Sequence, residues 1–407
     1  MEKTEIITVR ISGPDRPGVT TALTAILGHH GARILDIGQA NIHHSLSLAI
    51  IFEAETNKSG YILKDLLFKA DELGVNVGFS PLPKEEYSTW VNLQGKNRYT
   101  VTMLGRELNA TQISLVTSIL TEYKLNIEKI TRLTSRIPLS KANHLGRSCI
   151  EFSVRGTLDN FKELQNRFLT LSGTHQIDVA FQEENMYRRM RRLICFDMDS
   201  TLIQTEVIDE LADRAGVGEK VRAITESAMR GEIDFSESFE QRIRLLKGLD
   251  ESVLKEVAEN LPLTEGMTRL IRILKKGGYK IGILSGGFTY FGNYLKDKYG
   301  FDYVYANELE IIDGKLTGNY IGDIVDGKRK AELLKLIAQV EKVDLKQTVA
   351  VGDGANDLPM LAMAGLGIAF HAKPKVKENA QNSLSTVGLD GILYFLGYRD
   401  SMLEGDF

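Results

Sequence analysis

The chain has 407 residues, of which 43% are hydrophobic and 26% charged, a composition typical of a globular protein with two or three domains. Its formal net charge of -4 excludes a broadly basic surface, so we expect no nucleic-acid partner. Two cysteines exclude a disulfide framework, no apolar stretch reaches transmembrane length, and the N-terminal residues lack a signal-peptide core, so we expect a cytoplasmic protein without a membrane partner.

Residues 1–82 carry strand and helix patterns in the order βαββαβ, which is a ferredoxin-like arrangement. We expect strands at 5–12, 32–43, 45–54 and 75–82, and helices at 20–31 and 59–74. The next residues, 83–97, are polar and contain Pro, Lys, Glu, Ser and Gly, which predicts a linker.

The same order of elements returns at residues 98–184, and two such units in succession indicate an internal duplication. We expect strands at 98–105, 125–135, 148–156 and 175–182, and helices at 109–124 and 158–173. Four arginines follow in MYRRMRR (186–192), and we interpret this charged run as a solvated junction between domains.

Residues 185–407 predict a third domain with a doubly wound parallel α/β sheet, because its strands read as short, continuous apolar runs. The first run, Leu193 to Phe196, ends in Asp197 and Asp199. A helical insert is predicted at about 205–261, where apolar residues recur at helical spacing. Further on, Asp313-Gly314 predicts a hairpin.

Polar residues gather at the ends of the predicted strands, where open parallel sheets bind their ligands. Besides Asp197 and Asp199 these are Ser285, Gly286, Asp353, Asn356 and Asp357, and Lys330 opens a helical run between them. Two acids one residue apart can divide the work of nucleophile and proton carrier. Oxygen ligands of this kind suit Mg²⁺, and the hydroxyls of Ser200 and Thr201 suit phosphate oxygens. For this short motif alone, a solvated loop remains the alternative.

The motifs together resemble those of the haloacid dehalogenase superfamily. Within this superfamily, the chain resembles the phosphoserine phosphatase family more closely than other phosphatases. The resemblance rests on DMDSTLIQTE (197–206), AMRGEIDFSESFEQRIRLLKGL (228–249), LSGGF (284–288), RKAELL (329–334) and VGDGANDLPML (351–361). It implies a haloacid dehalogenase-like core whose helical insert is a mobile cap, and hydrolysis of O-phospho-L-serine through an aspartyl-phosphate.

The resemblance also implies a role for each matching residue. Asp197 would attack phosphorus, and Asp199 would be the acid and base. Mg²⁺ would be held by Asp197, the main-chain carbonyl of Asp199, and Asp353. Asp357 would orient Lys330 or the waters bound to the metal. The residues implied to contact substrate are Glu206, Met229, Phe235, Arg242, Ser285, Gly286, Lys330 and Asn356.

The two N-terminal units resemble ACT domains, which are small regulatory modules that often bind amino acids. In the first unit, DRPGV (15–19) resembles the family's glycine turn, so Asp15 and Gly18 are candidates for holding serine or another amino acid. The corresponding turn of the second unit, GRELNAT (105–111), lacks the Pro-Gly pair, which favours a structural role. Because ACT domains commonly pair edge to edge, the resemblance implies a homodimer.

Other functions remain open at this point. The substrate could be another small phosphomonoester, or the phosphoryl group could pass to an alcohol, and replacing Arg242 separates these from an amino-acid substrate. The chain could instead be an amino-acid sensor with a silent phosphatase fold, although Asp197, Asp199, Lys330 and Asp353 are all present. A dehalogenase is disfavoured, because Asp199 and Asp353 suit phosphoryl chemistry with Mg²⁺.

Overall fold

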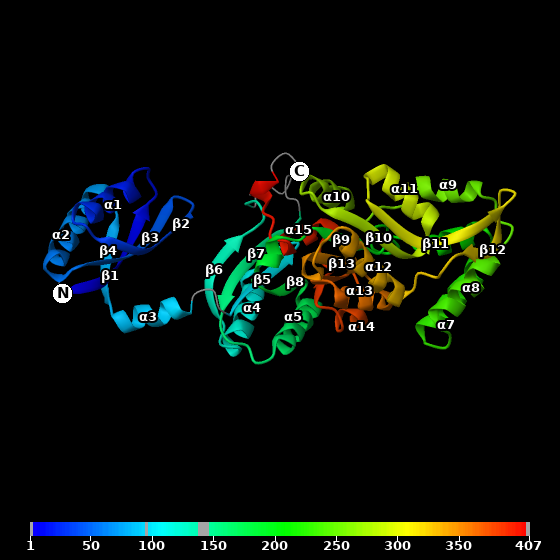
Figure 1. Ribbon diagram of the computed structural model, residues 1–407, viewed down its shortest axis with the longest axis horizontal. Helices are drawn as coiled ribbons and strands as arrows, with labels where there is room; N and C mark the ends of the chain where they lie inside the picture. Colours follow the sequence, from blue (N-terminus) through cyan, green and yellow to red (C-terminus); the bar gives the residue numbers. More distant parts are fainter. Residues whose placement is uncertain (1–2, 94–96, 137–145, 404–407) are drawn as a thin grey trace. The chain divides into compact units, whose positions relative to one another are not determined.

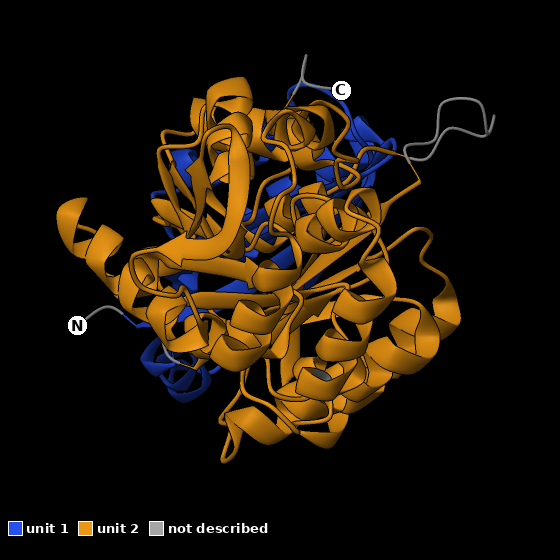
Figure 2. Cartoon of the chain, turned by 90° about the vertical axis from the view of Figure 1, so that its right-hand side faces the viewer, with its two compact units in different colours: residues 1–96 blue, residues 97–407 orange. Residues whose placement is uncertain are grey.

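The computed structural model describes residues 3–93, 97–136 and 146–403. These residues form two compact units, 1–96 and 97–407, which have different colours in Figure 2. Figure 1 labels most of the helices and strands.

The first unit has a four-stranded antiparallel sheet in the order β2-β3-β1-β4, with helices α1 and α2 packed on it. Alternate residues of the central strand are buried, from Leu46 to Ala54, which is the pattern of a sheet with one covered face. The elements are β1 (Thr4–Pro14), α1 (Val19–His29), β2 (Arg33–Ile42), β3 (Ser45–Glu55), α2 (Thr56–Leu73) and β4 (Asn76–Leu82).

The predicted linker, residues 83–97, is not irregular throughout, because it contains helix α3 (Lys84–Asn92). Pro83 precedes this helix, and Glu85 and Glu86 lie in its first turn, where negative charge is favourable. None of its residues is buried, so the polar composition that suggested a linker belongs to a solvent-exposed helix.

The second unit begins with another βαββαβ arrangement, here called the second βαββαβ domain (residues 97–184). Its strand order, β6-β7-β5-β8, repeats that of the first unit, as the predicted duplication requires. Its elements are β5 (Arg98–Gly105), α4 (Ala110–Glu122), β6 (Asn126–Arg132), β7 (Ser148–Arg155), α5 (Phe161–His175) and β8 (Asp178–Glu183).

The rest of the second unit is built on a seven-stranded sheet in the order β12-β11-β10-β9-β13-β14-β15. All pairs are parallel except β11 with β12. The strands are β9 (Leu193–Phe196), β10 (Lys280–Phe288), β11 (Tyr303–Ile312), β12 (Lys315–Ile321), β13 (Thr348–Gly352), β14 (Leu366–Phe370) and β15 (Asn382–Leu384). The helices beside it are α10 (Met267–Lys276), α11 (Thr289–Tyr299), α12 (Gly327–Val340), α13 (Leu358–Met363), α14 (Pro374–Lys377) and α15 (Ile392–Phe395).

Strand β9 lies in the middle of this sheet, and both of its faces are covered. Leu193 and Cys195 pack into one hydrophobic cluster with α12 and α13, whereas Ile194 and Phe196 pack into the other with α10 and α11. All four side chains are fully buried, as the continuous apolar run predicts. The strand therefore brings Asp197 to the carboxyl edge of the sheet on a rigid support.

The predicted helical insert forms helices α6 (Val207–Arg214), α7 (Gly218–Met229), α8 (Phe235–Leu245) and α9 (Ser252–Glu259). The two chain segments that connect it to the core run side by side. Ile203 pairs with Leu263, and the amide of Gln204 donates to the carbonyl of Pro262 at 2.8 Å. This two-stranded connection is the place where a cap could hinge.

The second βαββαβ domain has a hydrophobic core of its own, and four further residues join it to the core of the large sheet. Leu104, Leu133, Cys149 and Ala180 of that domain belong to the same buried cluster as Ile194 and Phe196. The carboxylate of Asp178 also crosses the junction, accepting from the amides of Ser385 and Thr386 at 2.9 and 2.8 Å.

The arginine-rich run at this junction is only partly solvated, so our interpretation from the sequence is wrong for two of its residues. Arg188 is 2% exposed and donates to Glu151 at 2.5 Å, and Arg191 is 4% exposed and donates to Gln182 at 3.0 Å. Burial lowers the pKa of Arg191 to about 10. The domains meet on these side chains, and a charge run read alone gives no sign of that.

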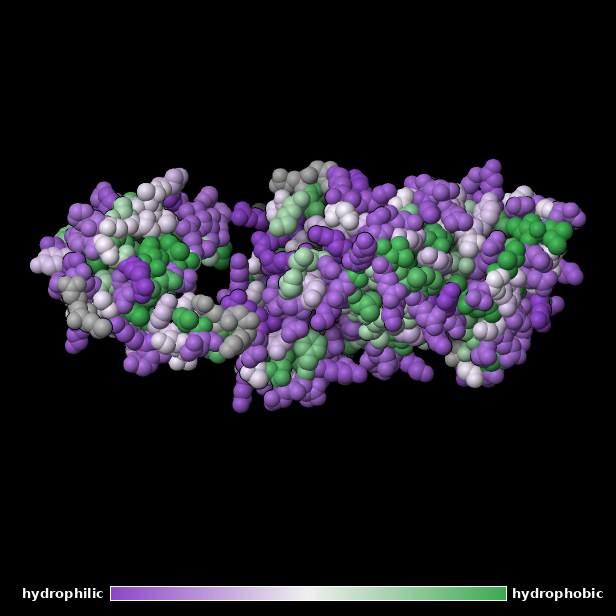
Figure 3. All heavy atoms as spheres, viewed as in Figure 1, coloured by the Kyte–Doolittle hydropathy of each residue, from purple (hydrophilic) through white to green (hydrophobic). Residues whose placement is uncertain are grey.

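Polar residues predominate on the face seen in Figure 3, with smaller apolar groups between them. Among the described residues, no helix is both long and apolar enough to cross a membrane.

Candidate active site

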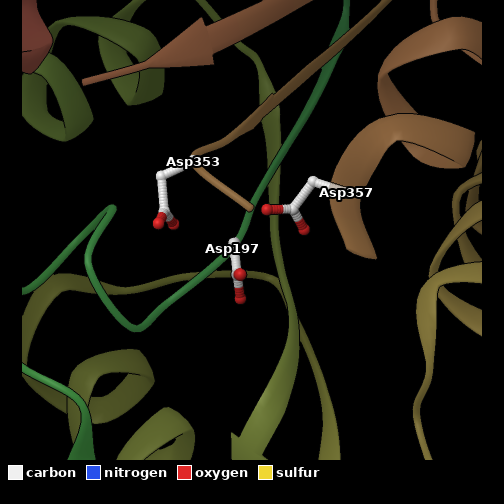
Figure 4. Close-up of side chains that lie close together, drawn as sticks. All are labelled: Asp197, Asp353 and Asp357. Carbon is white, nitrogen blue, oxygen red and sulfur yellow. The ribbon is translucent and has the colours of Figure 1, made fainter. Parts of the chain in front are cut away.

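Three carboxylates converge at the carboxyl edge of the large sheet (Figure 4). Asp197 follows β9, Asp353 follows β13, and Asp357 ends the short 3-10 helix η4 (Ala355–Asp357). One oxygen from each lies within 4.8 Å of the others. Such a set of hard oxygen donors, mostly buried, fits a small divalent cation.

Lys330 lies fully buried between two of these carboxylates. Its Nζ is 2.8 Å from Asp197 Oδ2 and 2.7 Å from Asp357 Oδ1. Burial alone would lower the pKa of Lys330, but Asp197 and Asp357 raise it above its ordinary value, so the side chain carries a positive charge. Helix α12 positions it, and the Asp326 side chain caps this helix by accepting from the amide of Arg329.

The remaining negative charge of the cluster is only partly neutralised. Burial, followed by the charges of Asp197 and Asp357, raises the pKa of Asp353 to about 8. Burial and Asp197 likewise raise the pKa of Asp357 to about 6, although Lys330 opposes this shift. Acids held this close repel one another, so a bound cation would relieve the strain.

Asp199 lies beside the last residues of strand β10. An added Cβ on Gly287 would lie 2.5 Å from Asp199 Oδ2, so only glycine lets the backbone come this close. Ser285 is fully buried, and its hydroxyl accepts from the amide of Gly287 at 2.9 Å. Burial raises the pKa of Asp199 well above its ordinary value, and Glu206 and Asp197 add to that shift. A protonated Asp199 can donate to a leaving group.

An apolar ring covers the end of β10. An added Cβ on Gly286 would lie 3.0 Å from Cζ of Phe235, the first residue of α8 in the helical insert. Phe235 therefore lies over Gly286, as expected of a lid residue. Met229 ends α7, but its side chain lies outside the described part of the structure.

Glu206 and Arg242 face the same space from the insert. The hydroxyl of Ser200 donates to Glu206 Oε1 at 2.7 Å. Burial lowers the pKa of Arg242, whereas Glu206 and Asp209 oppose that shift, so both carboxylates lie within electrostatic reach of the guanidinium. Burial also raises the pKa of Glu206. A carboxylate beside a partly buried arginine suits a ligand with both an ammonium and a carboxylate group.

The hydroxyls of Ser200 and Thr201, which by their sequence would suit phosphate oxygens, bond to carboxylates in this structure. Ser200 donates to Glu206, and Thr201 donates to Asp353 Oδ1 at 3.0 Å. Ser200 has a φ of 55°, a left-handed backbone that turns the chain sharply after Asp199.

Three further residues lie in or beside the site, and only Asn356 is predicted from the sequence. Asn356 lies in η4 between Asp353 and Asp357, with its backbone oxygen tight against Gly327. Asp209 and Asn307 are missing from our sequence analysis. Asp209 has a buried Oδ1 without a hydrogen bond, and Asn307 bonds to Gly286. Asp209 could have been suspected from the sequence, because it follows Glu206 by three residues and residues at this spacing are neighbours on a helix. No sequence pattern points to Asn307.

The first unit has its own pocket at the predicted glycine turn. A cavity of about 300 Å³ is lined by residues 15–21 together with Gln39 and Leu46. Gly18, with a φ of 94°, begins α1 without a side-chain cap, so the helix amides are open. Asn41 donates to Asp15 Oδ2 at 2.6 Å, and Thr20 donates to Gln39 at 2.9 Å.

Comparison with known proteins agrees with this geometry. Residues 191–365 match the haloacid dehalogenase-like hydrolase family, whose phosphatases generally use a divalent metal, and residues 5–80 match the ACT domain family. A phosphoserine phosphatase of Streptomyces coelicolor is 38% identical over 97% of this chain and 93% of its own length. One of Archaeoglobus fulgidus is 41% identical over 83% of this chain and 94% of its own length.

A crystal structure of a probable phosphoserine phosphatase from Vibrio cholerae, in unliganded form, aligns with a TM-score of 0.57 at 37% identity. The alignment covers 73% of this chain and 86% of that one. With a buried lysine paired to two members of an acidic cluster at the carboxyl edge of the sheet, and with relatives matched over nearly their whole length, the chain belongs to the phosphoserine phosphatase family.

Proposed function

We propose that this chain hydrolyses O-phospho-L-serine to L-serine and phosphate, the last step of serine biosynthesis. The observation that carries the proposal is Lys330, buried between Asp197 and Asp357, which form an acidic cluster with Asp353. A lysine and an acidic cluster placed around one nucleophile suit phosphoryl transfer, in which charge on three phosphoryl oxygens must be stabilised.

In the proposed reaction, an oxygen of Asp197 attacks phosphorus, and the bond to the serine oxygen breaks. Asp199 donates its proton to that leaving oxygen, which the raised pKa of Asp199 favours. The deprotonated Asp199 then takes a proton from water, which attacks the aspartyl-phosphate and releases phosphate. Lys330, Ser285 and the amide of Gly286 contact the phosphoryl oxygens throughout.

We infer Mg²⁺ as the metal. Asp197, Asp353 and the main-chain carbonyl of Asp199 would hold it, with Asp357 orienting Lys330 at 2.7 Å or the waters of the ion. When bound, the ion supplies positive charge for the phosphoryl oxygens. The oxygen-only donor set supports this choice over a metal that prefers sulfur or nitrogen.

Substrate choice would rest on the helical insert. Glu206 would bind the ammonium group of phosphoserine, and Arg242 would bind its carboxylate. Phe235 and Met229 would close over the serine carbons, and Asn356 would contact the phosphate. The cap excludes water from the nucleophile when it closes.

Phosphate release tests the proposal directly. O-phospho-L-serine is compared with a panel of small phosphomonoesters in the presence of Mg²⁺, with Asp197→Asn as the control variant. Preference for phosphoserine, lost in the variant and with EDTA, supports both chemistry and substrate. Release from other esters alone contradicts the roles of Glu206 and Arg242, and no release from any ester favours the sensor alternative.

We also propose that free serine binds the pocket of the first unit and lowers activity. The open amides after Gly18 suit a carboxylate, and Asp15 suits an ammonium. Calorimetric titration of serine into the enzyme tests this, because Asp15→Ala should remove one binding event and leave product binding at the active site. Equal binding by Asp15→Ala contradicts it.

A homodimer is the proposed assembly, in the cytoplasm. The edge strand β2 of the first unit exposes three isoleucines, with Ile42 81% exposed, and an unpaired apolar edge favours pairing with a second copy. Sedimentation velocity tests this: Ile42→Lys should shift the enzyme toward monomer.

The free, buried cysteines Cys149 and Cys195 suit a reducing compartment.

A further inference from the structure

Asn307 is a buried side chain that uses both ends of its amide. It lies on β11, is 1% exposed, and pairs in register with Phe288 of β10. Its Nδ2 donates to the carbonyl of Gly286 at 2.8 Å, and its Oδ1 accepts from the amide of Val325 at 2.8 Å. A buried amide with both groups satisfied holds its partners in one geometry.

The two backbone groups that Asn307 joins belong to separate parts of the phosphoryl site. Gly286 lies near the end of β10, and its carbonyl belongs to the same rigid peptide plane as the amide of Gly287, which donates to the hydroxyl of Ser285 at 2.9 Å. Val325 directly precedes Asp326, the cap of the helix that carries Lys330. One side chain thus fixes the peptide that orients the Ser285 hydroxyl and the start of the helix with the buried lysine.

The strand that carries Asn307 is also attached to the helical insert. Its hairpin turns at Asp313 and Gly314, both with positive φ, as the sequence predicts. From the insert, the amide of Gly248 donates to the carbonyl of Leu316 and the amide of Glu251 to that of Gly314, both at 2.8 Å. The hairpin therefore connects the cap at its tip with the end of β10 at its base.

We propose that Asn307 is a positioning residue for phosphoryl transfer, which holds the Gly286 peptide and the start of the Lys330 helix in register with each other. The inference rests on the proposed function and adds to it a residue that contacts neither substrate nor metal. Its two bonds are replaceable separately, because aspartate keeps an acceptor for Val325 but has no donor for Gly286.

The experiment compares Asn307→Asp and Asn307→Leu with the unmodified enzyme. The matched control is Asn382→Leu, since Asn382 is also buried, at 2% exposure, but donates to Gly367 on the far strands of the sheet. Binding of inorganic phosphate is measured by calorimetry with Mg²⁺ present, and kcat and KM are measured for phosphoserine and p-nitrophenyl phosphate. Thermal unfolding reports general loss of stability.

Both Asn307 variants should bind phosphate about tenfold more weakly and lose about tenfold or more in kcat/KM for both esters. The control should stay within about twofold on the same measures at a comparable Tm. If Asn307→Asp binds phosphate as tightly as the unmodified enzyme, or if the control loses as much as Asn307→Leu, the inference is overturned.

Failure of the proposed substrate gives a different result. In that case the unmodified enzyme binds phosphate and cleaves p-nitrophenyl phosphate but not phosphoserine. The phosphate-binding comparison still decides the role of Asn307, because it needs no turnover. If Asn307→Leu does not fold, Asn307→Asp carries the comparison alone.

Discussion

Arg242 is the side chain on which recognition of the substrate carboxylate depends. Arg242→Lys should raise KM for phosphoserine about tenfold or more, because an ammonium cannot form the paired hydrogen bonds of a guanidinium. KM for p-nitrophenyl phosphate should change little. Arg244→Lys is the control, since this exposed arginine of the same helix pairs with Glu240 at 3.1 Å. An equal rise in KM for both esters in Arg242→Lys would contradict the assignment.

Glu206 should give phosphoserine binding a pH dependence of its own. Burial raises its pKa above the ordinary 4.5, and only the ionised form attracts an ammonium. As pH falls through that raised pKa, KM for phosphoserine should rise relative to KM for p-nitrophenyl phosphate. The ratio cancels the titration of the phosphate group, whose second pKa is about 6. In Glu206→Gln the ratio should be flat, and an unchanged profile would exclude Glu206.

Asp353 should couple metal binding to stability. Mg²⁺ should raise the Tm of the unmodified enzyme, because it neutralises carboxylates that repel one another. Asp353→Asn should abolish most of this rise and most of the activity, and EDTA should do the same to the unmodified enzyme. The exposed Asp159→Asn is the control, and an undiminished rise in Asp353→Asn would rule out Asp353 as a ligand.

At the scale of elements, the attachment of β8 to the segment after β15 depends on Asp178. Asp178→Ala leaves the amides of Ser385 and Thr386 without their acceptor, so it should cost about 2 kcal/mol or more and lower Tm by about 4 to 8 °C. Differential scanning calorimetry measures this, with Asp159→Ala as the exposed control. Equal Tm values for the two variants would mean that the junction does not depend on this carboxylate.

Element boundaries follow the sequence where local chemistry decides them. The apolar run at 193–196 is a buried strand, because a short continuous apolar pattern favours a strand with both faces covered. Asp313-Gly314 is a hairpin turn, because both residues readily adopt the left-handed backbone that such a turn requires. Partners distant in the chain are not readable in this way. Arg188, Arg191 and Asn307 are buried only because separate elements close over them.

The same limit applies inside the active site. Strand-end carboxylates could be located from the sequence, since all parallel strands present their carboxyl ends at one edge. The bonds from the hydroxyls of Ser200 and Thr201 to Glu206 and Asp353 could not be located in this way, because they depend on the left-handed backbone at Ser200. A spacing in sequence does not give that conformation.

At the scale of the whole molecule, the shared core predicts how the chain can be shortened. A fragment of residues 97–407 should fold and keep the kcat of the full chain. It contains every residue of the buried hydrophobic cluster to which Ile194 and Phe196 of β9 belong. A fragment of residues 185–407 should be unstable, because it removes Leu104, Leu133, Cys149 and Ala180 from that cluster. Circular dichroism and phosphate release measure both, and equal stability of the two fragments would contradict the prediction.

The two βαββαβ units differ in what their buried residues contact outside the unit. The first unit has a hydrophobic core made of its own residues only, so it can be exchanged for another ligand-binding module. The second βαββαβ domain also has its own core, but Leu104, Leu133, Cys149 and Ala180 pack into the core of the catalytic sheet, so replacing this domain would disturb that sheet. Grafting a new sensor onto this protein should therefore replace residues before 97 and leave the second copy untouched.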